Sequence, residues 1–368
     1  MALGGEWAAG GGDRRARRPR SLSVDEYATG ILAGDRVVLA RAITLIESVR
    51  PDHQAMAREL VQRVLPHAGK SIRLGITGAP GVGKSAFIDA FGVLLTGHLH
   101  RVAVLSIDPS SAKSGGSLLG DKTRMARLSV DPAAFIRPSP SGLVLGGIAR
   151  QTRETMMLCE AAGFDIVLIE TVGVGQSEVT VADMTDFLLV LLTSGGGDEL
   201  QGIKRGLLEL ADLLAITKAD GDNVIAARQA AAKYAYAMHI LAGPDRDDAP
   251  VVTCSSLQGT GLGEIWTLIS DRISERERTG ALAKRRSDQN TTWMWSLVDQ
   301  QLREMLHEKA ALNRIARNAA AQVRAGTLSP VVAAERIRDA LFAGTAPPLH
   351  EPADVAQMED VADAANAA

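Results

Sequence analysis

The sequence predicts an α/β protein with a mostly parallel sheet flanked by helices. Between residues 71 and 271, short β-branched runs alternate with helical segments, the pattern of parallel strands joined by crossover helices. The 368-residue chain is 46% hydrophobic, which is ample for a buried core. The predicted strands are Ile72–Thr77, Val102–Ile107, Ile166–Glu170, Phe187–Leu192, Leu213–Thr217 and Val251–Cys254.

Helical extensions are expected on both sides of this region. Ser23 and Glu26 have the spacing of a capping box at the start of the first extension. Ser329 and Pro330 supply an N-cap and a first helical residue for the last helix. We expect five parts: a disordered tail over 1–20, a helical segment over 21–70, the α/β domain over 71–271, a C-terminal helical extension over 272–342 and a disordered acidic tail over 343–368.

Composition excludes several classes of protein. The net charge of -3 gives no general reason to expect nucleic acid as a partner. Cys159 and Cys254 lie far apart and form no C-x-x-C pair, so neither a disulfide framework nor a cysteine zinc site is indicated. No apolar run approaches the roughly 20 residues of a membrane span, and the N-terminus lacks a secretory h-region. We therefore expect a soluble, cytoplasmic protein with no membrane partner.

A phosphate-binding loop follows the first predicted strand. The pattern G-x-x-x-x-G-K-[ST] is met by Gly78, Ala79, Pro80, Gly81, Val82, Gly83, Lys84 and Ser85. Its glycines allow positive φ angles, so backbone N–H groups and the helix N-terminus beginning near Ala86 can face an anionic phosphate. Lys84 would reach the β/γ oxygens and Ser85 would ligate magnesium. Placed between a strand and a helix, the loop indicates a P-loop nucleotide-binding protein.

Two aspartates after the second strand are candidates for magnesium. Asp108 ends that strand, and Asp121 follows within Gly120-Asp121-Lys122-Thr123. Carboxylates suit a hard cation beside a triphosphate, although either could instead cap a helix.

A switch-like loop follows the third predicted strand. Glu170-Thr171-Val172-Gly173 has the form D-x-x-G with glutamate in place of aspartate. In nucleotide switches the acid supports magnesium and the glycine N–H contacts the γ-phosphate. A small GTPase would place a water-orienting glutamine directly after the glycine, but this chain has Val174 there and Gln176 two positions later. We expect slow intrinsic hydrolysis that a partner or another loop completes.

Guanine recognition is indicated near the end of the domain. Thr217-Lys218-Ala219-Asp220 resembles N-K-x-D, with threonine in place of asparagine. Asp220 can accept from both guanine N1–H and the exocyclic amine, while the Lys218 stem packs on the purine. The segment Ser255-Ser256-Leu257 follows the last strand, where a backbone N–H would meet guanine O6. These features predict GTP and GDP as ligands.

Four segments make the chain resemble a known family, that of MeaB and ArgK. They are Asp108-Pro109-Ser110-Ser111, the run GGSLLGDKTRM over 115–125, the run ETVGVGQSE over 170–178, and the run GDELQGIK over 197–204. Proteins of this family are P-loop GTPases associated with methylmalonyl-CoA mutase, and the resemblance covers roughly residues 23–341.

The resemblance implies a GTPase chaperone that guards adenosylcobalamin loading and integrity of a B12-dependent acyl-CoA mutase. It implies a homodimer built through the C-terminal helices, with the mutase as partner and its adenosyltransferase as a further candidate partner. Phosphate and magnesium positions would be Lys84, Ser85, Asp108, Asp121 and Glu170. The segment from Ser194 to Lys204 resembles a third mobile loop that relays nucleotide state, with Asp198 and Lys204 as its polar contacts.

Two other functions share the phosphate loop. A nickel-insertion GTPase should also bring a cysteine- or histidine-rich metal motif, whereas His98 and His100 alone are too few ligands. A small-molecule kinase is suggested by the older name of the family, but no separate acceptor pocket is visible in the sequence. Release of phosphate without a phosphorylated product would distinguish a GTPase from a kinase.

Overall fold

The computed structural model describes residues 22–107, 124–138, 145–171, 177–195, 205–242 and 248–343. These residues divide into two compact units, one ending at Arg286 and the other beginning at Ser287. The first unit holds the sheet.

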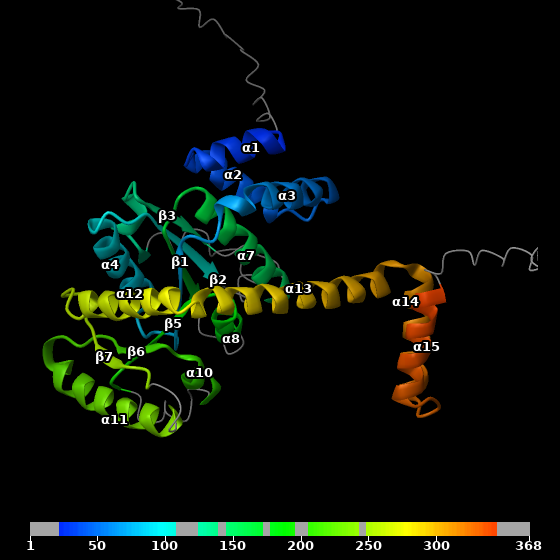
Figure 1. Ribbon diagram of the computed structural model, residues 1–368. Helices are drawn as coiled ribbons and strands as arrows, with labels where there is room; N and C mark the ends of the chain where they lie inside the picture. The colour runs from blue at the N-terminus through cyan, green and yellow to red at the C-terminus, as the bar shows by residue number, and fades with distance from the viewer. Residues whose placement is uncertain are drawn as a thin grey trace, which may run out of the picture. The chain divides into compact units, whose positions relative to one another are not determined.

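Seven parallel strands form one sheet in the order β3-β2-β4-β1-β5-β6-β7 (Figure 1). The six predicted strands are confirmed, with ends that differ by at most one residue. Because β1 lies at the centre of the order, the phosphate loop has strands on both sides of it. The strands are β1 Ile72–Gly78, β2 Val102–Ile107, β3 Ala134–Arg137, β4 Ile166–Thr171, β5 Phe187–Leu192, β6 Leu213–Ile216 and β7 Val251–Thr253.

Strand β3 was not predicted from the sequence. It is only four residues long, it lies at the edge of the sheet, and it follows Pro132. Such a short run has too few residues to show a clear alternation. Its pairing with β2, from Val102 with Ala134 to Leu105 with Arg137, is a tertiary contact that local patterning does not encode.

Helices cover both faces of the sheet, so two apolar cores form. One core packs against α7 and α11, and the other packs against α4 and α12 (Figure 1). Both faces are buried, which explains why β2, β4 and β5 read as continuous apolar runs rather than alternating ones. The helices of the sheet region are α4 Lys84–Gly97, α7 Leu145–Ala161, α8 Ser177–Ala182, α10 Arg205–Leu210, α11 Val224–Ala242 and α12 Leu262–Arg278, with short 3-10 turns η2 Leu128–Val130 and η3 Gly221–Asn223.

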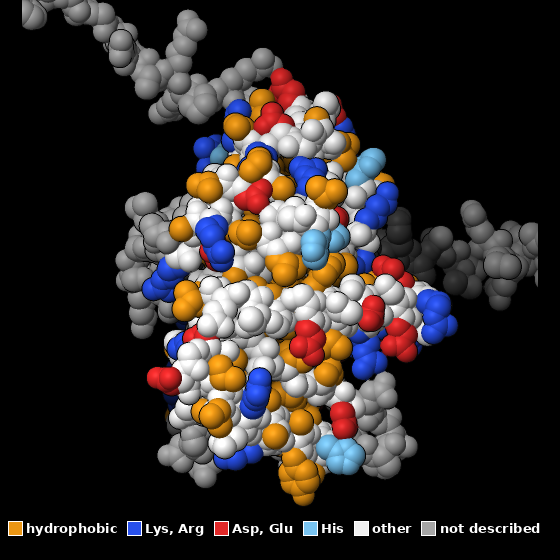
Figure 2. Space-filling view, turned by 90° about the vertical axis from the view of Figure 1, so that its left-hand side faces the viewer, with side chains coloured by type: hydrophobic (Ala, Val, Ile, Leu, Met, Phe, Trp, Pro, Cys, Tyr) orange, Lys and Arg blue, Asp and Glu red, His pale blue; other side chains and the backbone are white. Residues whose placement is uncertain are grey.

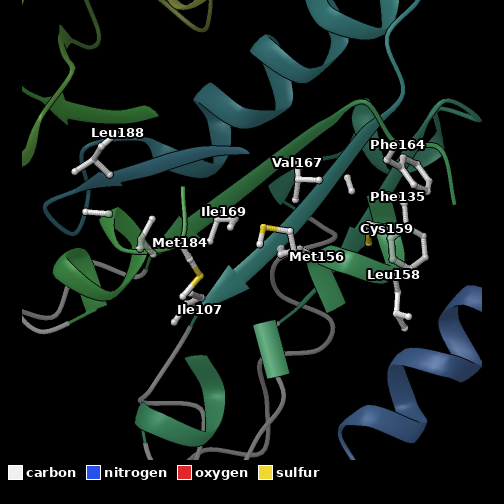
Figure 3. Close-up of a cluster of buried hydrophobic side chains, with 14 of the residues drawn as sticks. Ile107, Phe135, Met156, Leu158, Cys159, Phe164, Val167, Ile169, Met184 and Leu188 are labelled. Atoms are coloured by element: carbon white, nitrogen blue, oxygen red, sulfur yellow. The ribbon is translucent and has the colours of Figure 1, made fainter. Parts of the chain in front are cut away.

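The core under α7 shows how side chains from distant segments meet. In Figure 3, Met156 of α7 lies near Val167 of β4, and Cys159 of α7 lies near Phe135 of β3. All four side chains are buried. Burial raises the pKa of the Cys159 thiol well above its usual range, so this residue is a packing group and not a nucleophile.

Three N-terminal helices pack against α7 as a further layer. They are α1 Val24–Leu32, α2 Arg36–Ile46 and α3 Pro51–Val64, followed by the turn η1 Leu65–His67. The predicted capping box is confirmed: the Glu26 backbone N–H donates to the Ser23 hydroxyl, and the Ser23 N–H donates to the Glu26 carboxylate. Helix α2 ends at Ile46, and Pro51 is the first residue of α3.

The second unit is helical. It contains the remainder of α13 (Ala281–Glu308) together with α14 (Ala310–Arg324) and α15 (Pro330–Ala343). Helices α14 and α15 pack against each other. The predicted N-cap is confirmed, since Ser329 precedes α15 and its hydroxyl lies 3.5 Å from the Val332 backbone nitrogen.

The surface described here is mixed in charge. On the face in Figure 2, Lys and Arg side chains are interspersed with Asp and Glu, and the described residues of this face form no continuous basic surface. Among the helices of the described residues, none is long and apolar enough to cross a membrane.

Buried ion pairs tie α13 to the amino-terminal ends of the strands. Asp186, just before β5, accepts from Arg286 Nε at 2.8 Å and from the Arg73 backbone nitrogen at 2.8 Å. Arg73 in turn donates to both carboxylate oxygens of Glu160 on α7, at 2.7 and 3.0 Å. Burial acts to raise the pKa of Glu160, but the Arg73 guanidinium and the Ser71 hydroxyl more than offset it and hold that pKa below its usual range.

Replacing Asp186 should destabilise the fold strongly. In Asp186→Ala the Arg286 guanidinium loses its carboxylate while remaining largely buried, and removal of one partner of a buried pair costs about 3–5 kcal/mol. Urea unfolding followed by circular dichroism measures the shift in midpoint. The control is Asp52→Ala, which removes an exposed pair with Arg50 and should leave the midpoint unchanged. Equal midpoints for the two variants would contradict the network's role.

Candidate nucleotide-binding site

The phosphate loop joins β1 to α4, as predicted. Gly81 and Gly83 have φ angles of 82° and 100°, the left-handed conformation that glycine adopts at low cost. Gly78 has no room for a side chain, because a Cβ there would lie 2.4 Å from the Leu191 carbonyl oxygen of β5. Helix α4 begins at Lys84 and not at Ala86, so Lys84 and Ser85 both belong to its first turn.

Lys84 lies inside the curve of the loop. Its Nζ donates to the Gly78 carbonyl oxygen at 2.7 Å and to the Ala79 carbonyl oxygen at 3.1 Å, and the residue is 8% exposed. A buried ammonium beside backbone N–H groups at a helix N-terminus makes this region electropositive. The arrangement suits a polyphosphate.

Ser85 and Glu170 come together from adjacent strands. Glu170 lies near the end of β4 and pairs in register with Ile76 of β1, so its side chain reaches the start of α4. The Ser85 hydroxyl donates to Glu170 Oε1 at 3.2 Å. These two oxygen donors are the kind that magnesium prefers. Asp108 and Asp121, the other two predicted ligands, lie outside the described residues.

A cavity of about 440 Å³ opens between these groups. Two of its lining residues, Ser106 and Arg124, were missed in the sequence analysis. Ser106 of β2 lies opposite Glu170 in the strand register, and its buried hydroxyl has no hydrogen-bond partner among the described residues. A ligand oxygen or its hydration water would supply that partner. The full lining is Pro80, Gly81, Gly83, Lys84, Ser85, Ala86, Ser106, Arg124 and Glu170.

Arg124 could have been found from the sequence. It falls within the run over 115–125 that carried the family resemblance, although it was not singled out there. Arg124 gives the lining of the phosphate cavity a second cationic residue in addition to Lys84. Ser106, in contrast, lies in an apolar strand and gave no signal.

Thr217 ties the base-recognition loop to the phosphate loop. Its hydroxyl lies 2.7 Å from the Val82 carbonyl oxygen and 3.1 Å from the Leu192 carbonyl oxygen, both acceptors. Thr217 is 2% exposed, so this hydroxyl bonds within the protein rather than to solvent. The departure from asparagine is therefore compatible with an anchored loop.

Lys218 and Asp220 lie beyond this anchor. Lys218 Nζ donates to the Gly81 carbonyl oxygen at 2.8 Å, which lays its stem along the loop. The Ser255 hydroxyl donates to Asp220 Oδ2, so one carboxylate oxygen is held from the side of β7. Ser256 is half-buried and Leu257 is 87% exposed, and neither lines the cavities described here. The backbone role of Ser255, Ser256 and Leu257 toward guanine O6 stays a prediction.

A second cavity, of about 500 Å³, lies on the other side of the phosphate loop. It contains Lys218 and Asp220, and it shares Pro80 and Gly81 with the phosphate cavity. The sequence motifs for phosphate and base thus line two cavities that share part of the phosphate loop. The lining is Ala79, Pro80, Gly81, Val82, Leu191, Leu192, Thr193, Ser194, Gly195, Lys218, Asp220 and Asn223.

Gly173, Asp198 and Lys204 lie outside the described residues. Within the described part of the chain, no three His, Cys, Asp or Glu side chains are grouped as a metal site would need.

Cys254, directly before the Ser255 loop, is buried, and burial raises the pKa of its thiol to about 12.

Comparison with known proteins identifies the family. The family described as "Methylmalonyl Co-A mutase-associated GTPase MeaB" matches residues 39–311, well over half of the chain. The chain belongs to the MeaB family. Its members are P-loop GTPases, and the phosphate and guanine motifs of this MeaB-family chain fit hydrolysis of GTP.

Individual relatives agree. A putative GTPase of Caulobacter vibrioides is 53% identical over 318 residues, covering 86% of this chain and 97% of the relative. The mouse methylmalonic aciduria type A homolog, a mitochondrial protein, is 45% identical over 323 residues, covering 85% of this chain and 78% of the relative. A solved structure titled LAO/AO transport system kinase is 37% identical, with a TM-score of 0.70, covering 87% of this chain and 97% of that one.

Asp220 should decide the choice of base in this MeaB-family GTPase. In Asp220→Asn, one acceptor becomes a donor, so affinity for GDP should fall by roughly tenfold or more while affinity for xanthosine diphosphate rises. Displacement of a fluorescent nucleotide measures both. Asp222→Asn, at an exposed neighbour, serves as the control. An unchanged preference for guanine over xanthine in Asp220→Asn would refute the assignment.

The Thr217 anchor can be tested separately. Thr217→Val keeps the shape but removes the hydroxyl, leaving the Val82 carbonyl oxygen without this donor, so affinity for GDP should fall roughly three- to tenfold. Thr217→Ser retains the hydroxyl and should bind GDP nearly as the parent does. If valine and serine variants bind GDP equally, the hydroxyl does not anchor the loop.

Proposed function

We propose that this chain uses GTP binding and hydrolysis to control adenosylcobalamin loading and protection of a B12-dependent acyl-CoA mutase, methylmalonyl-CoA mutase. The family description names that enzyme, and the mouse relative is named after methylmalonic aciduria. The observation that carries the nucleotide part is the Ser85–Glu170 contact beside the buried Lys84, on the same loop that Thr217 anchors.

The site chemistry supports a magnesium-dependent GTPase. Lys84 and Arg124 would offset charge on the terminal phosphates, and backbone N–H groups of residues 81–86 would orient them. Magnesium, if held by Ser85 and supported by Glu170, would neutralise the β and γ oxygens. The described lining of the phosphate cavity contains no glutamine to orient water. We therefore infer slow intrinsic turnover that a partner accelerates.

The C-terminal helices offer a surface for assembly. A homodimer through the C-terminal helices would cover apolar side chains of α13 that are now accessible, among them Trp295, which is 60% exposed. An adenosyltransferase that supplies the cofactor is the further partner in this proposal, and the assembly is cytoplasmic.

A kinase is the second candidate, because a solved structure with a kinase title has the same fold over most of this chain. A kinase would transfer the γ-phosphate to an acceptor, whereas a GTPase transfers it to water. Radiolabelled γ-phosphate distinguishes the two: inorganic phosphate as the sole labelled product supports the GTPase, and a labelled small molecule supports the kinase.

Purified methylmalonyl-CoA mutase should accelerate GTP hydrolysis by this chain by roughly tenfold or more, since a partner can complete positioning and charge stabilisation worth ~10³–10⁵ in rate. Phosphate release is measured with and without the mutase, and Lys84→Ala controls for contaminating activity. A different acyl-CoA mutase is the specificity control. No acceleration by methylmalonyl-CoA mutase, together with acceleration by the other mutase, would reassign the partner.

A further inference from the structure

The Asn223 side chain connects two segments that the nucleotide motifs do not connect. Asn223 closes the turn η3, three residues after Asp220. Its Nδ2 donates to the Lys218 carbonyl oxygen at 2.7 Å, and its Oδ1 accepts from the Ser194 hydroxyl at 2.6 Å. Because a carbonyl oxygen only accepts, the amide nitrogen must face Lys218, which fixes the orientation of the amide.

Lys218 needs such support. Its φ angle is 56°, and Leu99 is the one other non-glycine residue with positive φ in the described part of the chain. A left-handed lysine is strained, and strained residues persist where several contacts determine them. Three hydrogen bonds hold this segment. The Asn223 amide donates to the Lys218 carbonyl oxygen, and Lys218 Nζ donates to the Gly81 carbonyl oxygen. The backbone nitrogen of Ala219 donates to the Cys254 carbonyl oxygen at 3.0 Å.

The Asn223–Ser194 pair lies at the ligand cavity. Both residues line the cavity of about 500 Å³ that also contains Lys218 and Asp220. Ser194 follows β5, so the hydrogen bond crosses from the end of β5 to the loop after β6. A change in this bond would therefore alter the wall of the guanine site directly.

We propose that Asn223, oriented by Ser194, is a positioning residue for guanine. By bonding the Lys218 carbonyl, it maintains the left-handed backbone that directs Lys218 toward the phosphate loop and Asp220 toward the base. Base recognition in this chain thus extends beyond the T-K-x-D run to two residues outside it. The inference concerns the GTPase site alone and is independent of the mutase proposal.

The main test compares Asn223→Ala with Asp222→Ala, a neighbouring exposed residue in the same turn. Dissociation constants for GDP and inosine diphosphate are measured by fluorescent-nucleotide displacement, and KM and kcat are measured for GTP. Inosine lacks the exocyclic amine, so the ratio of the dissociation constant for inosine diphosphate to that for GDP reports how well Asp220 is placed. Asn223→Ala should weaken GDP binding roughly three- to tenfold, lower that ratio, and raise KM for GTP more than it changes kcat. Asp222→Ala should match the parent.

Two further comparisons separate the bonds of Asn223. Asn223→Asp keeps an acceptor for the Ser194 hydroxyl but removes the donor to the Lys218 carbonyl oxygen. Its affinity for GDP should therefore fall at least as far as that of Asn223→Ala. Ser194→Ala should lower GDP affinity by less than Asn223→Ala does, and Ser194→Thr should retain the parent's affinity. Adding Ser194→Ala to Asn223→Ala should lower GDP affinity little further.

Three results would overturn the inference. The first is GDP affinity in Asn223→Ala equal to that of the parent. The second is an equal loss of GDP and inosine diphosphate affinity accompanied by a lower thermal midpoint, which would indicate a structural role only. The third is full additivity of the Ser194 and Asn223 substitutions.

Discussion

The phosphate loop is held from both sides by side chains from distant parts of the sheet region, and the site depends on this constraint. On one side, the Thr217 hydroxyl and Lys218 Nζ bond to carbonyl oxygens of the loop itself. On the other, Ser85 bonds to Glu170 of β4. A glycine-rich loop has many accessible conformations, so external bonds that fix it reduce the entropy lost when a nucleotide binds. The candidate groups for phosphate, magnesium and base are therefore held in place relative to one another without a ligand.

Much of this arrangement could be predicted from the sequence because it is local. The glycine pattern, the apolar strand before it and the helix after it specify the phosphate loop within about 25 residues. The rule that parallel strands present their carboxyl ends at one edge then brings Glu170 and the Lys218 loop to the same place. The capping box at Ser23 and the N-cap at Ser329 are likewise short-range patterns, and both are present.

What could not be predicted depends on contacts between distant segments. Strand β3 exists because β2 pairs with it, and Ser106 matters because it lies opposite Glu170 in that sheet. From the sequence, Asn223 is an ordinary turn residue. Its hydrogen bond with Ser194, 29 residues earlier, is visible only in the structure. For the same reason, the sequence does not show that Thr217 anchors the loop, since the Val82 carbonyl oxygen that accepts from it lies 135 residues away in the chain.

The ion pairs of Asp186, Arg73 and Glu160 lie at the amino-terminal ends of the strands, and the nucleotide motifs follow the carboxyl-terminal ends. One end of the sheet thus contributes mainly to folding stability, and the other carries the nucleotide motifs. Inherited or engineered changes near Asp186 would chiefly reduce how much folded protein a cell retains, because small losses in folding free energy alter abundance. Changes near Lys84 or Asp220 would instead leave normal amounts of a protein that handles guanine nucleotides poorly. Measuring cellular protein level alongside nucleotide binding would assign an unexplained variant to one end or the other.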